Sequence, residues 1–289
     1  MFQTVDVFTD RKFGGNPLAV VLDAEGLTTE QMQAIAAEFN LAETTFVLPP
    51  KDPAHTAQVR IFTPKAELPF AGHPNVGTAF VLARMGRGGD RLVFEEIAGL
   101  VPLAVTREDG AVVATRLAAP QPLTLVETVA REIVASAVGL APGDILGEPV
   151  VAATGTKFLF AEVTSRAVLG KALYSVEAFR KHLPMERTVG VHLYVAAAEH
   201  GVDVQTRMFA PLFGVPEDPA TGAANVTLIG LLAHYDPRAD LSLTKTIGQG
   251  FDMGRPSLLQ ASAEKKAGKV VATYIGGRCV PMLSGTIEV

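Results

Sequence analysis

Two stretches, Arg60-Ile61-Phe62-Thr63-Pro64 and Gly72-His73-Pro74-Asn75-Val76-Gly77-Thr78-Ala79, decide the fold that this sequence predicts, because a similar pair returns in its second half. The second pair reads Arg207-Met208-Phe209-Ala210-Pro211 and Glu217-Asp218-Pro219-Ala220-Thr221-Gly222-Ala223-Ala224. Both copies contain Arg-x-Phe-x-Pro and, after a short gap, a polar residue followed by Pro-x-x-Gly-x-Ala. A pattern repeated once at this separation predicts two similar domains, each with a loop that leads into a helix.

The aligned copies place His73 and Asp218 at the same position. Titratable side chains on two such loops can face one another across a cleft, which suits proton transfer. Each residue also has a structural explanation. His73 can cap the helix that Pro74 begins, and an Asp before a Pro is a good N-cap. A catalytic and a structural role both stay open for these two residues.

Glu43 lies between an apolar helical segment and an apolar strand, in Asn40-Leu41-Ala42-Glu43-Thr44-Thr45-Phe46. A single carboxylate at a strand entrance is usually solvated. Partial burial would instead raise its pKa toward neutrality and make it a usable general base. Both alternatives stay open at this stage.

Composition limits the class of protein. The 289 residues favour two domains, and 48% hydrophobic with 19% charged residues indicates a compact fold. The net charge of −5 argues against binding to nucleic acid or to an anionic membrane. The single cysteine, Cys279, excludes an internal disulfide and a cysteine-rich zinc site. With no signal peptide and no apolar run that spans a bilayer, we expect a soluble cytoplasmic protein.

Local patterns predict an α/β protein of the α+β kind. Thr28-Thr29-Glu30-Gln31 matches a capping box and opens a helix that ends at Asn40. Two helices of small and apolar residues follow the repeated loops, and the strands between them lack a regular βαβ rhythm. We therefore expect two pseudo-symmetric domains, 1–118 and 119–289, each a mixed, mostly antiparallel sheet curled around a central helix, with the last strand able to cross back. Further helices are expected at 127–138 and 175–183, and strands at 149–153, 157–163, 190–196 and 202–209.

Other polar residues show no catalytic pattern. The remaining histidines have no metal-ligand spacing, and we expect no metal site. The pairs Glu95-Glu96 and Lys265-Lys266 are expected to be solvated, and Cys279 to be a small buried hydrophobe.

Taken together, these motifs resemble the phenazine-biosynthesis PhzF-like isomerases, and they match in order over nearly the whole chain. The residues that carry the resemblance are Phe13-Gly14-Gly15-Asn16-Pro17, Asn40–Val47, Arg60–Pro64, Glu67–Pro74, Glu217–Gly222, Gln249-Gly250 and Met253–Ser257.

The resemblance implies a diaminopimelate-epimerase-like fold, with the active site in the cleft between two domains. It implies that Glu43 is the acid/base and that His73 and Asp218 contact the substrate and assist proton transfer. The paired cysteines of the epimerase relatives are missing here. The family motif also often has Ser where this chain has Ala223, so one hydroxyl donor is lost and the phenazine precursor is not assigned as the substrate.

The sequence therefore predicts a cofactor-independent isomerase that moves a proton between carbons of a small unsaturated or cyclic carboxylic acid. Backbone N–H groups after Gly72 and Gly222 would hold the carboxylate. The partners expected are this small molecule and a second copy in a homodimer, with no nucleic acid and no membrane. Two alternatives are a non-catalytic binding protein on the same fold and a two-base amino-acid racemase using His73 and Asp218. The predicted substrate-binding residues are Gly72, Asn75, Gly222 and Ala223.

Overall fold

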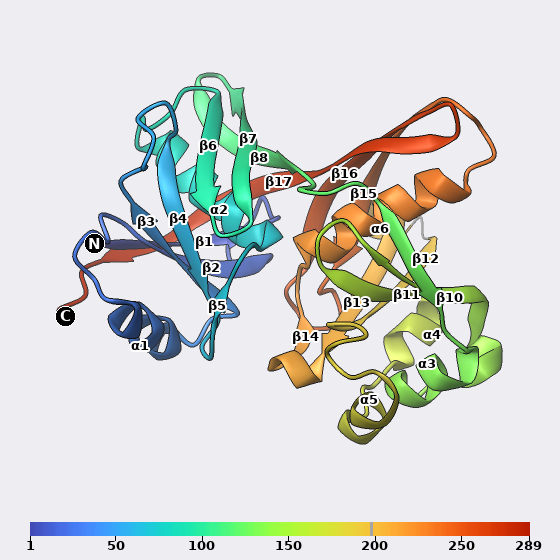
Figure 1. The fold of residues 1–289 in the computed structure, drawn as a ribbon. Helices are drawn as coiled ribbons and strands as arrows, with labels where there is room; N and C mark the ends of the chain where they lie inside the picture. Colours follow the sequence, from blue (N-terminus) through green and yellow to red (C-terminus); the bar gives the residue numbers. More distant parts are fainter. Residues whose placement is uncertain (197–198) are drawn as a thin grey trace. The chain divides into compact units, whose positions relative to one another are not determined.

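The computed structural model describes residues 1–196 and 199–289 and divides into two units (Figure 1). Unit 1 comprises Met1–Ala118 and Ile275–Val289, and unit 2 comprises Ala119–Tyr274. The strand β17 (Lys269–Gly285) contributes to both units. Sheet dominates each unit and helices are few, so the predicted α+β class is confirmed.

The strands of unit 1 close into a ring around one helix. Antiparallel pairs join β17 to β1 and β1 to β2, a parallel pair joins β2 to β3, and β3 is antiparallel to β4. β4 is parallel to β6. The pairs β6–β7 and β7–β8 are antiparallel, and β8 pairs with β17, which closes the ring. The strands are β1 (Phe2–Val7), β2 (Asn16–Val21), β3 (Glu43–Leu48), β4 (Ala57–Phe62), β5 (Glu67–Leu68), β6 (Arg91–Glu96), β7 (Gly99–Glu108) and β8 (Ala111–Ala118).

The helix inside this ring is α2 (Gly72–Arg84), and every residue from Gly72 to Ala83 is buried. Gly77 lets α2 approach the sheet, because a Cβ there would lie 2.6 Å from a Leu18 methyl and 2.7 Å from a Val7 methyl. The second helix, α1 (Thr29–Phe39), packs outside the ring. It has the predicted capping box at Thr28 and a left-handed C-cap at Asn40.

Unit 2 repeats this plan around α6 (Gly222–Tyr235), which packs on β10, β15 and β16. The pattern of parallel β11–β12, antiparallel β12–β13 and parallel β13–β15 pairs matches that of β2–β3, β3–β4 and β4–β6 in unit 1. The repeated arginines lie on the corresponding strands β4 and β13. The strands are β9 (Thr124–Thr128), β10 (Ile145–Ala153), β11 (Lys157–Val163), β12 (Val191–Ala196), β13 (Val204–Ala210), β14 (Val215–Asp218), β15 (Leu241–Gln249) and β16 (Ser257–Lys266).

Three short helices of unit 2 lie in a separate apolar layer with Val151, Leu193 and Phe209: α3 (Arg131–Val138), α4 (Arg166–Lys171) and α5 (Val176–His182). The expected helix at 127–138 begins only at Arg131, because residues 124–128 pair with β10 as strand β9. The helix α4 was not predicted from the sequence. Its start is marked by Ser165, whose hydroxyl accepts a hydrogen bond from Val168 N.

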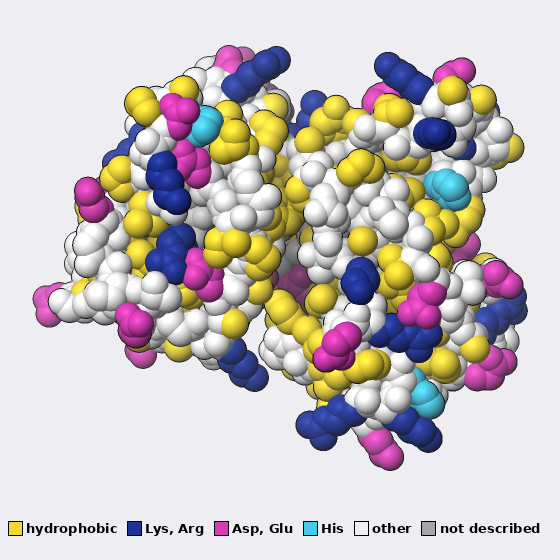
Figure 2. Space-filling view, in the orientation of Figure 1, with side chains coloured by type: hydrophobic (Ala, Val, Ile, Leu, Met, Phe, Trp, Pro, Cys, Tyr) yellow, Lys and Arg dark blue, Asp and Glu magenta, His cyan; other side chains and the backbone are white. Residues whose placement is uncertain are grey.

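Charged side chains of both signs are interspersed over the face drawn in Figure 2. Among the described residues, no helix is both long and apolar enough to cross a membrane. Cys279 is buried as predicted, and burial raises the pKa of its thiol to about 12.

Lys265 is not solvated, contrary to the prediction from sequence. Along β16 the alternate residues Leu259, Ala261, Ala263 and Lys265 are buried, so the pleat turns Lys265 inward. Its ammonium donates to the carbonyls of His234 at 3.0 Å and Asp236 at 2.7 Å, and thus satisfies the end of α6.

We predict that Lys265→Met lowers the free energy of unfolding by about 2 kcal/mol, because two charge-assisted hydrogen bonds are lost. The matched control is Lys266→Met, since Lys266 is exposed on the same strand. Urea unfolding followed by circular dichroism measures both. Equal unfolding free energies for the two variants would contradict this role of Lys265.

Candidate active site

The repeated arginine forms the same clamp in each unit. In unit 1, Arg60 donates from Nε and Nη2 to the two carboxylate oxygens of Glu67, both at 2.7 Å. Its guanidinium lies over the ring of Phe62, 5.1 Å from the centroid. The Arg-x-Phe-x-Pro motif is thus a bidentate ion pair on an aromatic platform, which fixes the segment leading into the helix.

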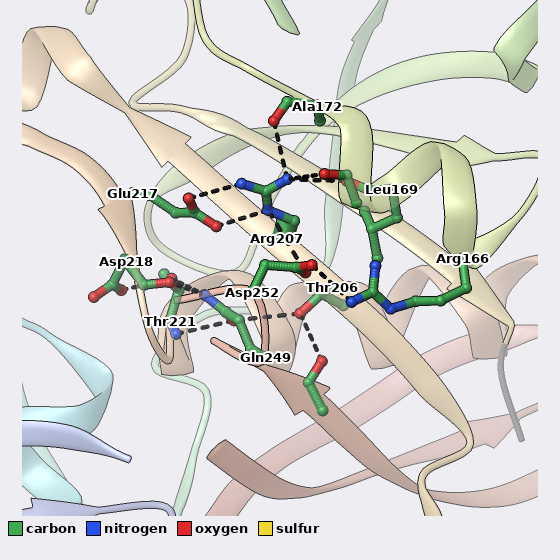
Figure 3. A network of polar contacts seen from close by, with 12 residues as sticks. Arg166, Leu169, Ala172, Thr206, Arg207, Glu217, Asp218, Thr221, Gln249 and Asp252 are labelled. Carbon is green, nitrogen blue, oxygen red and sulfur yellow. Dashed lines mark hydrogen bonds and ion pairs between the residues drawn. The ribbon is translucent and has the colours of Figure 1, made fainter. Parts of the chain in front are cut away.

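In unit 2, Arg207 donates to the two oxygens of Glu217 at 2.7 and 2.9 Å and lies 4.9 Å from the Phe209 centroid (Figure 3). Asp252 accepts from Arg166 at 2.8 Å and lies 3.9 Å from Arg207. This network holds Glu217, the residue before Asp218. The third guanidinium nitrogen of Arg207 donates to the carbonyls of Leu169, Gly170 and Ala172.

The two buried helices begin in equivalent ways. Neither has a side-chain cap, and each starts with a glycine, Gly72 or Gly222. The amide of Asn75 donates to the carbonyl four residues earlier at 2.9 Å, and that of Asn225 does the same at 3.0 Å. The shared Gly-x-x-Asn geometry therefore sets the true register of the repeat.

The predicted alignment of His73 with Asp218 at one position of the repeat is wrong. His73 is the second residue of α2, so its counterpart is Ala223, the second residue of α6. Asp218 ends β14, four residues before α6. The alignment matches Pro74 with Pro219, but only Pro74 lies inside a helix, so the two prolines are not equivalent. His73 does not cap its helix, and the N-cap position of α6 belongs to Thr221 and not to Asp218.

Glu43 and His73 meet in unit 1. Glu43 is the first residue of β3, its side chain is 13% exposed, and its Oε2 lies 3.5 Å from Nδ1 of His73. The same Nδ1 lies 3.4 Å from the amide nitrogen of Asn16, the first residue of β2. Because β2 and β3 are parallel neighbours, their starts reach the start of α2 together.

His73 is neutral at physiological pH. Burial lowers the pKa of its ring to about 3, and a hydrogen bond with the Pro17 backbone opposes this only partly. Nδ1 can accept from the Asn16 amide or donate to the Glu43 carboxylate, depending on the tautomer of the ring. Nε2 has no hydrogen-bond partner among residues 1–196 and 199–289.

Asp218 lies in a second polar cluster, within unit 2. It is 6% exposed, and its Oδ2 accepts a 2.6 Å hydrogen bond from the Thr221 hydroxyl. The buried amide of Gln249 donates to the Asp218 carbonyl at 2.7 Å and accepts from Asn225 at 2.7 Å and from Thr221 N at 3.2 Å (Figure 3). Gln249 therefore fixes Asp218, Thr221 and Asn225 around the start of α6.

No group of three or more His, Cys, Asp or Glu side chains in the described part of the chain is arranged to hold a metal ion.

Comparison with known proteins identifies the family. The model of the phenazine biosynthesis-like protein family, PhzC-PhzF, matches residues 5–285. The chain belongs to this family. An uncharacterized isomerase from Mesorhizobium japonicum is 39% identical, over 98% of this chain and 96% of its own length. The trans-2,3-dihydro-3-hydroxyanthranilate isomerase of Pseudomonas aeruginosa is 36% identical, over 98% of each chain. The protein is thus a PhzF-family isomerase.

A solved structure shares the fold. The crystal structure of a PhzF-family phenazine biosynthesis protein from Bacillus anthracis superposes with a TM-score of 0.89 at 24% identity, and the match covers all of both chains.

A second buried histidine of this PhzF-family chain, His192, lies beside the start of α6. His192 is completely buried, and its Nε2 lies 3.1 Å from Asn225 Oδ1 in the first turn of α6. Burial lowers its pKa to about 4, and the bond to Asn225 opposes this only partly. Residues 191 to 193 of β12 are all buried, so no alternation of buried and exposed positions marks His192.

We predict that the rings of His73 and His192 stay neutral from pH 8 to pH 5, which NMR of the imidazole signals can follow. The folded pKa values of about 3 and about 4 lie below the ordinary 6.5. The unfolded state therefore binds more protons between these values, and the folded state loses stability as the pH falls below about 6.5. A ring signal that titrates near pH 6.5 would contradict the burial argument for that residue.

Proposed function

We propose that this isomerase transfers a proton between carbons of its substrate through Glu43, without a cofactor. The observation that carries the proposal is the contact between the partly buried Glu43 carboxylate and the buried ring of His73. A carboxylate in a partly dry site can take a proton from a carbon next to an unsaturated acid and return it at another carbon. No step of this shuttle needs electron transfer.

The choice of Glu43 as the base follows from the environment of His73. A ring whose pKa is about 3 is a weak base at neutral pH, so it is poorly suited to remove a carbon-bound proton. A neutral imidazole can instead orient the substrate, because its Nε2 is not used by the described residues. The ring then serves as a hydrogen-bonding partner of the substrate while Glu43 carries the proton.

The substrate we propose is a small unsaturated or cyclic carboxylic acid. The starts of α2 and α6 lack side-chain caps, and uncapped N–H groups at a helix start bind carboxylates. Gly72, Asn75, Gly222 and Ala223 lie in these first turns. Asp218 is proposed as a further substrate contact, held in position by Thr221 and Gln249. The Pseudomonas relative acts on trans-2,3-dihydro-3-hydroxyanthranilate, a molecule of this general kind.

A two-base racemase is the other enzymatic candidate. It needs a base on each face of one carbon, and the candidates would be His73 and Asp218. The depressed pKa of His73 argues against this pair. A binding protein without turnover would not need the contact between Glu43 and His73, and isomerases among the relatives speak for catalysis.

We predict that Glu43→Gln lowers turnover by roughly 10²-fold or more while ligand binding survives, because the amide keeps the shape but not the basicity. Incubation in D₂O with a panel of unsaturated and amino acids, read by mass and NMR, finds the substrate and measures exchange. Glu38→Gln is the matched control, since Glu38 is exposed on α1. Native turnover in Glu43→Gln would refute the shuttle.

A second prediction concerns Ala223, which lies in the first turn of α6 and is partly exposed. Ala223→Ser should strengthen binding of a hydroxylated cyclic acid about fivefold, equivalent to about 1 kcal/mol for a neutral hydrogen bond. Calorimetric titration of the two proteins measures this. Unchanged affinity for every acid that binds would show that position 223 does not face the ligand.

A further inference from the structure

Five buried polar side chains of unit 2 form one hydrogen-bonded network, which we call the His192 network. Its members are at most 8% exposed, and they are His192, Asn225, Gln249, Thr221 and Asp218. The ring of His192 packs edge-on against Phe160, with 5.6 Å between the ring centroids, and its Nε2 lies 3.1 Å from Asn225 Oδ1. The network thus joins strand β12 to the start of α6 and to Asp218.

Backbone groups fix which way the two amides of the network point. The Thr221 carbonyl can only accept, so the Asn225 atom that lies 3.0 Å from it is the nitrogen. The Thr221 N–H can only donate, so the Gln249 atom that lies 3.2 Å from it is the oxygen. It follows that Asn225 presents Oδ1 to His192, and that Gln249 presents Nε2 to the Asp218 carbonyl at 2.7 Å.

These orientations also determine the tautomer of His192. An amide oxygen can only accept, so the ring nitrogen that faces Asn225 Oδ1 must carry the hydrogen. The other ring nitrogen, Nδ1, is buried and has no hydrogen-bond partner among residues 1–196 and 199–289. A hydrogen on Nδ1 would therefore leave two buried groups unsatisfied. The neutral ring of His192 is the Nε2–H tautomer.

The hydrogen bonds of the network all have the same direction. His192 donates to Asn225, and Asn225 Nδ2 donates to Gln249 Oε1 at 2.7 Å. Gln249 Nε2 then donates to Thr221 Oγ1 at 3.0 Å, and the Thr221 hydroxyl donates to Asp218 Oδ2 at 2.6 Å (Figure 3). Hydrogen bonds in such a series strengthen one another. The series starts at an imidazole and ends at the Asp218 carboxylate, which acts as an acceptor.

Unit 1 has a different residue at the position of His192. His192 and Thr45 each precede the residue that pairs with the repeated arginine on the next strand, so the two positions are equivalent. The Thr45 hydroxyl bonds to the Thr78 hydroxyl at 2.8 Å. Asn75, the counterpart of Asn225, has no partner for its Oδ1 in the described part of the chain. A donor to this asparagine oxygen is therefore a feature of unit 2 and not a requirement of the fold.

The position of Gln249 also differs between the units. Its counterpart is Glu96, because the residues before each pair with Gln205 of β13 and Gln58 of β4. Both carboxyl oxygens of Glu96 are buried, so the expected solvation of Glu96 is wrong, and burial raises its pKa to about 8. Unit 1 thus has neither the imidazole nor the amide of the His192 network.

We propose that His192 is a positioning residue that holds the Asp218 carboxylate in place through Asn225 and Gln249. The inference rests on the proposed function for the role of Asp218 as a substrate contact, whereas the network itself does not depend on it. Without a donor at position 192, the Asn225 oxygen would be buried and unsatisfied. Asn225 would then compete for the N–H groups that hold Gln249, and Asp218 would lose its fixed position.

The first test needs no substrate. Nitrogen-15 NMR of the imidazole in the full chain at pH 7 should show a hydrogen on Nε2 of His192 and a bare Nδ1. A ring that carries its hydrogen on Nδ1 would overturn the proposal, because it could not donate to Asn225.

A matched pair of variants tests whether the donor at position 192 orders the network. Gln can donate from its amide nitrogen near the place of Nε2, whereas Met has similar length and no donor. In His192→Met the side-chain amide hydrogens of Asn225 and Gln249 should exchange with D₂O roughly tenfold or more faster, and in His192→Gln close to the native rate. Native rates in His192→Met would overturn the proposal. The same acceleration at the N–H of Val134 in α3, outside the network, would overturn it too, because it shows a general loss of stability.

Kinetics then tests the link to Asp218, with the substrate found by the D₂O panel. His192→Met should raise KM roughly tenfold, His192→Gln should restore it, and neither should change KM once Asp218→Ala is present. An unchanged KM in His192→Met, or the same effect with and without Asp218, would overturn action through Asp218. Native turnover in Glu43→Gln would refute only the shuttle, because the NMR results on His192 do not depend on it.

Discussion

The burial of most of a helix start inside each sheet is the constraint on which the rest of the structure depends. The first N–H groups of a helix have no partner within it. In unit 2, Gln249 accepts from Thr221 N and from the Asn225 amide, which holds the residues at the start of α6 in place. The Arg–Glu clamps fix the segments that lead into both helices. In the proposed function, the uncapped N–H groups at these buried starts bind the substrate carboxylate.

Burial also sets the protonation states around these starts. It lowers the pKa of His73 and His192 and raises that of Glu96, so all three side chains are uncharged at pH 7. In the proposed function, Glu43 is the base because the neighbouring His73 ring is a weak one. In such surroundings a charged substrate interacts strongly with the few groups that can ionise, because water does not screen them.

The sequence predicted the fold class, the family and the burial of the two central helices, because repeated motifs and apolar composition determine these features. It misaligned His73 with Asp218, because proline was matched where Gly-x-x-Asn carries the geometry. Glu96 and Lys265 were predicted to be solvated, although each follows inward-facing residues at a spacing of two, and this signal was available. The role of Gln249 depends on contacts with residues 24 to 43 positions away, which no local pattern encodes.

The central claim is that one carboxylate carries a substrate proton from carbon to carbon. It is tested most directly by a single turnover, in ordinary water, of a substrate deuterated at the carbon that exchanges. The account predicts that product carries part of this deuterium at its new carbon, because Glu43 holds the label in a partly buried site until it is returned. Product whose new carbon–hydrogen bond comes entirely from solvent would contradict a single shuttling group.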